Sequence, residues 1–369
     1  MEAIGADLSF VNLGITFTHL PNSISVFGFR IAFYGVIIGL GMLAGMAVAF
    51  SDAKRRGQDP DLYLDFALYA IVFSIIGARF YYVAFEWDNY KNDLLQIFNL
   101  RAGGLAIYGG VIGAVITLIV FTKVRHQSFF SMADTGVLGL LTGQIIGRWG
   151  NFFNCEAFGG YTDSLFAMRI KESIVNPSMI SQELIDHRIV ENGISYIQVH
   201  PTFLYESVWN LSVLLFMLWY RKRKRFDGEM LWIYFLGYGV GRFWIEGLRT
   251  DSLYLFNWEL FGQRIRVSQA LSIVMVAVAA FMLFYNIRIK KRSPESLWVH
   301  QVAAEKARLA AAEAEDAVLA ETLMNEVPTE GEAADPLETE AVETPDAGTV
   351  PDTETQEKPE KGETHGNEN

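Results

Sequence analysis

Seven apolar segments divide residues 1–292, and each is about as long as a helix that crosses a membrane. A helix needs roughly 20 mainly apolar residues to cross the hydrocarbon core of a bilayer. The segments lie near residues 30–50, 63–85, 104–122, 129–147, 203–220, 230–248 and 268–287. This pattern predicts an all-α integral membrane protein with seven transmembrane helices.

Clusters of lysine and arginine lie between alternate apolar segments and indicate how the helices are oriented. The clusters are Lys54 with Arg55 and Arg56, Lys123 with Arg125, residues 221–225, and Arg288 with residues 290–292. Because Lys and Arg concentrate in cytoplasmic loops, an odd number of spans with the N-terminus outside places every cluster in the cytoplasm. The alternative, that residues 221–225 bind nucleic acid, is weaker because every basic cluster adjoins an apolar segment.

Residues 293–369 differ from the rest of the chain in composition. They hold 20 of its 42 acidic residues but only 4 of its 30 basic residues. Such a segment cannot bury enough apolar surface to fold alone. We therefore expect a membrane domain over residues 1–292 and an acidic, mostly disordered cytoplasmic tail over residues 293–369. Within the tail, residues 301–324 are rich in helix-forming residues and are predicted to be a solvated helix, with disorder past Asn325.

The longest segment outside the predicted bilayer is residues 151–199, between the fourth and fifth helices. It is too polar to insert and is expected to form a small extracytoplasmic subdomain. Residues 165–170 and 194–199 are predicted to be short strands, with Asn192 and Gly193 as a turn. His200 follows this segment, where a single histidine is more often a structural hydrogen-bonding residue than a catalyst.

Polar side chains within the apolar segments gather at the predicted outer ends of the helices. They are Tyr34, Arg79, Tyr81, Tyr108, Gln144, Arg148, Tyr205, Glu206, Arg242 and Glu246. Ionisable groups are costly in a membrane and normally face the bundle interior or a wet cavity. We therefore expect six helices to line one polar cavity near the outer surface. The inner halves of the spans are read as almost bare of charge.

Arginines in this outer region outnumber their obvious carboxylate partners. The two sets are Arg79, Arg148, Arg242 and Arg249 against Glu156, Glu206 and Glu246. Arg242 and Glu246 are spaced to pair on one helix, and Glu206 could neutralise Arg79. For any one residue, a role in stapling helices together is as reasonable as a role in binding. The surplus positive charge suits an anionic ligand, and a phospholipid headgroup supplies phosphate at this depth.

An anionic-solute transporter is the main alternative function. It would need polar residues through the full depth of the membrane, which the inner halves do not supply. A metal-dependent enzyme would need grouped Asp, Glu or His ligands, and the spans carry none with ligand spacing. Cys155 is the only cysteine, which excludes an internal disulfide and a multi-cysteine metal site.

Glycines spaced four residues apart are predicted to allow close helix packing. The pairs are Gly35 with Gly39, Gly109 with Gly113, and Gly237 with Gly241.

The segment GRWGNFFNCEAFGG, residues 147–160, resembles the signature of the bacterial prolipoprotein diacylglyceryl transferases. The matching positions are Gly147, Arg148, Gly150, Asn151, Phe152, Asn154, Glu156 and Gly159. Other blocks of the family are resembled, in order, by FYG at 33–35, GAR at 77–79, GGLAIYGG at 103–110, HPTFLYE at 200–206 and GRFWIEGLR at 241–249. The resemblance covers about residues 25–290 and leaves out the acidic tail.

This resemblance implies a multi-pass enzyme of the bacterial cytoplasmic membrane with seven helices and its N-terminus outside. The implied reaction transfers the diacylglyceryl group of phosphatidylglycerol to the lipobox cysteine of a prolipoprotein signal peptide and releases glycerol phosphate. It is the first step of lipoprotein maturation. No cofactor, metal or nucleic-acid partner is expected.

Site residues are predicted from the resemblance together with the movement of charge in the reaction. A thiol that attacks a glycerol carbon shifts charge onto the leaving phosphate, and arginines would stabilise that charge. We assign this role to Arg148 and Arg242, with Glu246 orienting Arg242. Phosphatidylglycerol binding is predicted for Arg148, Asn151, Asn154, Glu156, Gly159, Tyr34, Arg79 and Glu206.

Tyr108 stands where better-known members of the family carry histidine. A tyrosine, with a free pKa of about 10, is a poor base near neutral pH. Tyr108 is therefore predicted to be a hydrogen-bonding or positioning residue of the catalytic site. Cys155 is predicted to be a small packing residue, because the acceptor cysteine belongs to the substrate.

Overall fold

The computed structural model describes residues 7–100, 103–251, 254–260 and 263–325. A helix lies at each of the seven apolar segments. These helices are α1 (Phe33–Arg55), α2 (Asp61–Phe85), α3 (Ile107–Val124), α4 (Phe129–Asn154), α6 (Thr202–Tyr220), α7 (Glu229–Leu248) and α8 (Val267–Phe284). Within the described ranges, six helices are long and apolar enough to cross a membrane, and α7, which carries Arg242 and Glu246, is not among them. The protein is thus mostly helical, as an integral membrane protein of this kind should be.

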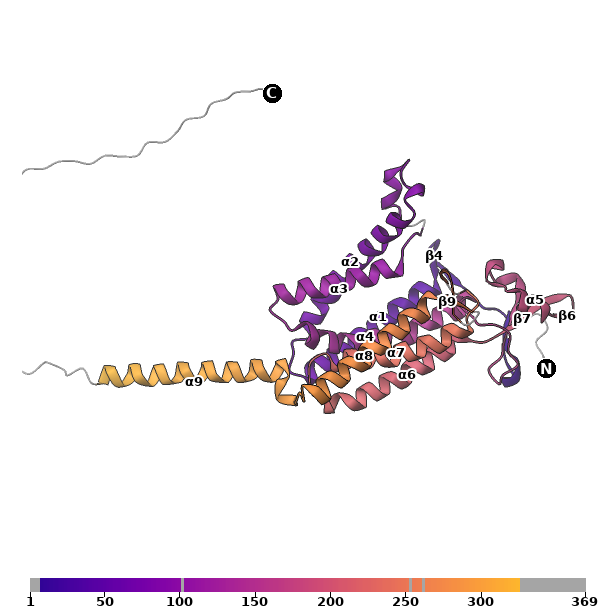
Figure 1. The fold of residues 1–369 in the computed structure, drawn as a ribbon. Helices are drawn as coiled ribbons and strands as arrows, with labels where there is room; N and C mark the ends of the chain where they lie inside the picture. The colour runs from indigo at the N-terminus through magenta and orange to yellow at the C-terminus, as the bar shows by residue number, and fades with distance from the viewer. Residues whose placement is uncertain (1–6, 101–102, 252–253, 261–262, 326–369) are drawn as a thin grey trace, which may run out of the picture. The chain divides into compact units, whose positions relative to one another are not determined.

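Contacts link five of these helices in the order α1, α4, α6, α7 and α8. The five run together in one bundle (Figure 1). An apolar core that includes Leu138 and Leu141 of α4, Met217 of α6 and Tyr234 of α7 joins three of them. Helices α2 and α3 pack on each other. A second apolar cluster, made by Ala53, Tyr63, Phe121 and Met132, ties this pair to α1 and α4.

Glycines allow close approach of helices at two of the three predicted pairs. A Cβ atom added at Gly109 would lie 2.3 Å from the Gly77 carbonyl oxygen of α2. Gly237 and Gly241 are covered by Val213 and Trp209 of α6.

The prediction for Gly35 and Gly39 is wrong, because nothing lies within 4 Å of a Cβ atom built at either position. Helix α1 instead meets α4 through Gly45, where an added Cβ atom would lie 2.5 Å from the Gly139 carbonyl oxygen. Gly45 lies six residues beyond Gly39, which at 3.6 residues per turn is a different face of the helix.

Replacement of Gly45 with valine is expected to destabilise the protein by about 1–3 kcal/mol, because the new methyl groups must push α1 and α4 apart. Thermal unfolding in detergent measures the effect. Gly39→Val is the matched control and should leave the midpoint nearly unchanged. Equal midpoints for the two variants would contradict this account of the α1–α4 contact.

A five-stranded antiparallel sheet, of strand order β2-β1-β5-β7-β6, packs against the C-terminal end of α4. Its strands are β1 (Leu8–Phe10), β2 (Ile15–Phe17), β5 (Met168–Lys171), β6 (Ile189–Glu191) and β7 (Ile194–Val199). The predicted strand 194–199 is confirmed, and β5 begins three residues later than predicted. Asn192 and Gly193 have positive φ angles of 52° and 78°, as a tight turn between twisted antiparallel strands requires.

The N-terminal strands β1 and β2 were not predicted, because three-residue strands carry too little alternation to recognise. Their residues Leu8 and Phe10 share a core with Phe152 at the end of α4. The sheet therefore includes N-terminal strands, and the predicted boundary at 151 falls inside α4, which continues to Asn154.

Two strand pairs and one short α-helix accompany these elements. They are β3 (Ser23–Val26) paired with β4 (Phe29–Ala32), β8 (Tyr254–Leu260) paired with β9 (Gln263–Arg266), and the single-turn helix α5 (Gln182–Asp186). The helix predicted over 301–324 is present as α9 (Trp298–Asn325), while the prediction of disorder past Asn325 concerns residues outside the described ranges.

The first compact unit runs to Ala311, beyond the predicted domain boundary at 292, and the second begins at Ala312. The start of the predicted tail belongs to the first unit because it is bonded there. The Trp298 N–H donates to Asp227 Oδ2 at 2.7 Å, and the Ser296 hydroxyl donates to the Arg225 carbonyl at 3.3 Å.

Candidate active site

Four ionisable side chains from three helices meet at the C-terminal end of α4, and we call them the outer arginine cluster: Arg148, Glu206, Arg242 and Glu246. Glu206 of α6 is buried and contacts both arginines, Arg148 through Nε and Arg242 through Nη1 at 2.6 Å. Arg242 also meets Glu246, one turn further along α7, at 2.6 Å. The predicted Arg242–Glu246 pair is therefore confirmed.

The two arginines of the cluster differ in how far their donors are occupied. Both terminal nitrogens of Arg242 are engaged, Nη1 by Glu206 and Nη2 by Glu246 and, at 3.5 Å, the Ser268 hydroxyl. Arg148 reaches Glu206 only through Nε, and its side chain is 22% exposed. Among the residues that the structure describes, its Nη1 and Nη2 have no hydrogen-bond or ion-pair partner. Arg148 therefore presents the free edge of a guanidinium, the edge that binds two oxygens of a phosphate.

Two asparagines beside Arg148 converge on one carboxylate. The side-chain amides of Asn151 and Asn154 donate to Glu156 Oε1 at 3.0 and 3.2 Å. The chain can fold back in this way because Cys155 ends α4 in the left-handed conformation, with φ of 49° and ψ of 46°. Asn151, Asn154 and Glu156 thus form a hydrogen-bonded polar group within the motif 147–160. We call this group the polar corner, and it begins one helical turn beyond Arg148 on α4.

Gly159 joins the end of this motif to two other helices. Its N–H donates to the His200 carbonyl at 2.9 Å, and the Gly160 N–H donates to the Leu248 carbonyl at 2.9 Å. A Cβ atom at Gly159 would lie 2.8 Å from both the His200 Cβ atom and the Leu248 carbonyl oxygen. Only glycine fits this crossing, so Gly159 holds the ends of α6 and α7 in place, and its contact with lipid stays a prediction.

Arg79 does not lie in the cluster, and its predicted pairing with Glu206 is wrong. The Arg79 side chain is buried, and its nitrogens donate to the carbonyls of Gln96, Ile97, Asn99, Gly103 and Gly104 at 2.6–3.2 Å. These five bonds match the five N–H donors of a guanidinium, so no donor is left for a phosphate. Arg79 therefore holds the segment between α2 and α3 in place through these hydrogen bonds. The sequence could not predict this role of Arg79, because every residue has a backbone carbonyl and no residue type identifies the acceptors.

The remaining outer arginine and the two tyrosines are also placed. Arg249 is neutralised by Asp251, with N–O distances of 2.7 and 2.9 Å, which reduces the predicted surplus of positive charge. Tyr34 is partly exposed and lies on the backbone of Gly150, directly beside the helix that carries Arg148. Tyr108 is partly exposed, and its ring is tilted by 46° against that of Tyr81, with 6.5 Å between ring centroids. No described contact of Tyr108 reaches the outer arginine cluster.

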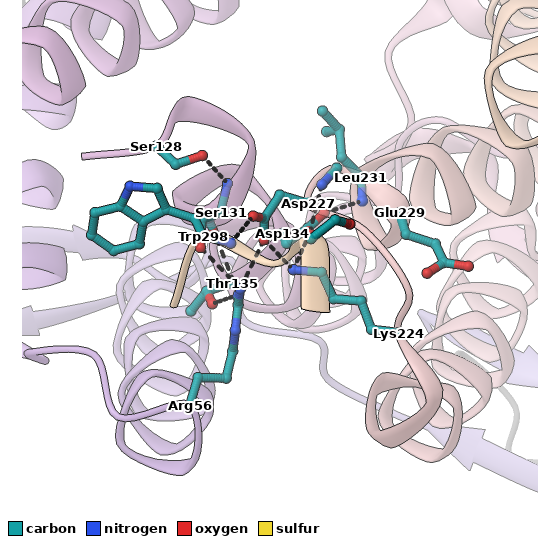
Figure 2. Close-up of polar contacts among 12 residues, drawn as sticks. Arg56, Ser128, Ser131, Asp134, Thr135, Lys224, Asp227, Glu229, Leu231 and Trp298 are labelled. Atoms are coloured by element: carbon teal, nitrogen blue, oxygen red, sulfur yellow. Dashed lines mark hydrogen bonds and ion pairs between the residues drawn. The ribbon is translucent and has the colours of Figure 1, made fainter. Parts of the chain in front are cut away.

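A group of buried charges near the other end of α4 was not predicted from the sequence (Figure 2). Asp134 is fully buried and binds Lys224 Nζ at 2.6 Å, and Asp227 binds the same nitrogen at 2.8 Å. Arg56 donates to Thr135 Oγ1 at 2.8 Å. The prediction that the inner halves are almost bare of charge is therefore wrong, and the overlooked signal was Asp134 itself, inside the segment 129–147.

The contacts of His200 are those of a structural hydrogen-bonding residue. Its Nδ1 atom lies 3.3 Å from the Tyr205 hydroxyl, and its backbone bonds to Gly159 and Gly160. Burial lowers the pKa of the His200 imidazole, so the ring is neutral at pH 7. Within the described ranges, no three His, Cys, Asp or Glu side chains are grouped as metal ligands would be.

Cys155 is buried, and this burial raises the pKa of its thiol to about 11. Because the reactive form is the thiolate, alkylation of the folded protein by iodoacetamide at pH 8 is expected to be much slower than alkylation of the unfolded protein. Mass spectrometry of the tryptic peptide measures the rate. Ionisation of the Cys155 thiol is less favourable in the folded state than in the unfolded state. The free energy of unfolding is therefore expected to fall as the pH rises from about 9, the unfolded thiol pKa, toward about 11. Rapid labelling at pH 8 without unfolding would contradict the predicted packing role.

Comparison with known proteins identifies a single family. A family model described as prolipoprotein diacylglyceryl transferase matches residues 21–285. A phosphatidylglycerol–prolipoprotein diacylglyceryl transferase from Clostridium botulinum is 39% identical over 272 residues, which cover 74% of this chain and 99% of the relative. Proteins of the same name from Listeria welshimeri and Bacillus cytotoxicus are each 40% identical, over 74% and 71% of this chain and 92% and 89% of their own lengths.

Proposed function

This chain belongs to the prolipoprotein diacylglyceryl transferase family, and we propose that its reaction takes place at the outer arginine cluster. The protein is a transferase of lipoprotein maturation that moves the diacylglyceryl group of phosphatidylglycerol to a prolipoprotein. The observation that carries the proposal about the site is the free Nη edge of Arg148, held by a buried carboxylate among polar residues of the motif 147–160.

The membrane arrangement that goes with this site has seven spans, with the N-terminus outside and residue 293 onward in the cytoplasm. Helix α7 is the sixth of these seven spans, and the pairing of Arg242 with Glu206 and Glu246 lowers the cost of placing its charges in the membrane. The outer arginine cluster then lies near the extracytoplasmic surface, with the sheet and residues 155–200 above it. The compartment is the bacterial cytoplasmic membrane, where phosphatidylglycerol and signal peptides meet.

In this arrangement Arg148 binds the phosphate of phosphatidylglycerol through Nη1 and Nη2. Asn151, Asn154 and Glu156 form the adjacent polar corner, and Tyr34 lines its side. Glu206 serves a different purpose from the lipid contact predicted for it. By accepting from both arginines it fixes their separation, while Glu246 orients Arg242.

The reaction shifts negative charge toward these arginines. The sulfur of the acceptor lipobox cysteine attacks the glycerol carbon that carries the phosphate, so a carbon–sulfur bond forms and the carbon–oxygen bond breaks. Glycerol phosphate leaves with the electron pair. The thiol proton is taken up by the new phosphate monoester, whose second pKa is about 6, or by water. Preorganised guanidiniums stabilise the charge that grows on the phosphate in the transition state.

The alternative of an anionic-solute transporter is disfavoured by the described core. Polar groups occur at both ends of α4, but Leu138 and Leu141, which lie between Asp134 and Arg148, are completely buried in an apolar cluster. A solute path needs polar lining throughout.

The direct test incubates the purified protein with phosphatidylglycerol and a peptide that carries a lipobox cysteine. Mass spectrometry should detect the diacylglyceryl thioether on the peptide and an equal amount of glycerol phosphate. A peptide with serine in place of the cysteine should give neither product. Failure of the folded protein to form the thioether would overturn the proposal.

Replacement of Tyr108 with phenylalanine is expected to leave most of the transfer rate intact, because its hydroxyl has no described contact with the outer arginine cluster. A general base would instead contribute roughly 10²- to 10⁴-fold. The same assay measures the rate, with Tyr81→Phe as the matched control from the facing helix. A loss of that size confined to Tyr108→Phe would show that the hydroxyl takes part in proton transfer.

A further inference from the structure

A second cationic site lies at the end of the bundle opposite Arg148. A cavity of about 350 Å³ is lined by six basic side chains, Arg55, Arg56, Arg221, Lys222, Arg223 and Lys224. Its remaining wall is formed by Pro294, Leu297, Val299 and His300. The basic side chains come from the end of α1 and from the turn between α6 and α7. This volume is at the lower end of the range of small-molecule sites, about 300–1,000 Å³.

Four of these cations are held in place by polar partners that are mostly buried, and one of them, Arg55, binds Asp52 at 2.8 Å. Lys224 is fixed by Asp134 and Asp227 (Figure 2), and Arg221 by Asp52 at 3.0 Å. Arg56 donates to the Ser131 carbonyl at 3.1 Å as well as to Thr135. Freely solvated lysines and arginines would not need such anchors, so this wall of the cavity is preorganised.

The remaining two cations, Lys222 and Arg223, leave positive charge without a carboxylate partner among the described residues. Among the described residues, Lys222 has no ion-pair partner, and Arg223 stacks on the Trp219 ring at 4.2 Å instead of meeting a carboxylate. The Nε atom of Arg221 is buried without a hydrogen-bond partner. A buried donor with no acceptor is rare in folded proteins, and a bound anion would supply the acceptor. In the described part of the chain, three carboxylates, those of Asp52, Asp134 and Asp227, are bonded to the six cations.

We propose that this cavity, the inner basic pocket, binds a phosphate group carried by a lipid headgroup or by a small soluble phosphate ester. Arginine and lysine donors that converge from two segments match the oxygens of a phosphate. The site is separate from the transfer reaction. Asp134 and Arg148 are 14 residues apart on α4, which is about 21 Å at 1.5 Å per residue.

The test measures binding of two phosphate probes to the full chain in uncharged detergent. Native mass spectrometry counts bound dioleoyl phosphatidic acid, and isothermal titration measures binding of glycerol 3-phosphate. The variant is the double substitution Lys222→Gln with Arg223→Gln, because neither side chain holds a buried carboxylate. Lys91→Gln with Arg188→Gln, two exposed cations away from the pocket, is the matched control.

Phosphate binding to the pocket is expected to weaken at least tenfold in the Lys222/Arg223 variant and to stay unchanged in the control. Binding of both probes identifies the phosphate group alone as the ligand, and binding of phosphatidic acid only identifies a lipid. Equal binding in the variant and the parent, or no binding of either probe, would overturn the proposal. Transfer activity of the variant should match the parent, so this result is independent of the outer site.

Discussion

Replacement of Arg148 with alanine is expected to reduce the rate of diacylglyceryl transfer by roughly 10²- to 10³-fold, the usual loss when one preorganised donor to a developing anion is removed. The expectation rests on the free Nη edge of Arg148, since the other outer arginines are engaged by carboxylates or carbonyls. The loss should appear in kcat/KM for phosphatidylglycerol, measured by the thioether assay. Arg148→Lys should recover part of it, because lysine restores the charge without the planar fork.

A matched control separates this effect from general damage. Arg188→Ala removes an arginine that pairs with Glu172 at 2.7 Å in the sheet subdomain, and it should leave transfer unchanged. Removing Arg148 also leaves Glu206 with Arg242, so the fold should persist. Full activity of a folded Arg148→Ala protein would exclude the proposed phosphate site.

Replacement of Asp134 with alanine is expected to cost about 3–5 kcal/mol of stability, because it leaves the buried Lys224 with one carboxylate fewer. Asp134 also supplies the side-chain hydrogen-bond acceptor that the N-terminus of α7 lacks. Gly228 is the N-cap of that helix and has no side chain, and the Asp134 carboxylate accepts from the Gly228 and Leu231 N–H groups at 2.8 and 2.9 Å. An aspartate of α4 thus caps α7 from outside the helix.

Chemical denaturation in mixed micelles measures this loss. Asp65→Ala, which breaks an exposed pair with Arg125, is the control and should cost no more than about 1 kcal/mol. The double variant Asp134→Leu with Lys224→Met should be more stable than Asp134→Ala, because it leaves no uncompensated charge inside the protein. A single variant as stable as the Asp65 control would mean that Asp134 does not hold the α4–α7 contact.

The correct sequence predictions rest on local or one-dimensional patterns. Helix positions followed from runs of apolar residues as long as a bilayer is thick, and the Arg242–Glu246 pair followed from i,i+4 spacing. The strand 194–199 and the turn before it were recognisable from residue types. The motif 147–160 identified the family because its polar residues are packed into one short segment.

The tertiary structure decided which charges meet. Glu206 binds Arg148 and Arg242 rather than Arg79, Arg79 binds backbone carbonyls, and Asp134 reaches Lys224. The sequence shows how far along its helix each charged residue lies. Which charged residues meet depends on how each helix is rotated about its axis, and the packing of distant residues sets that rotation. The Gly45–Gly139 contact shows this directly, since it turns α1 to a face that the glycine spacing at 35 and 39 did not indicate.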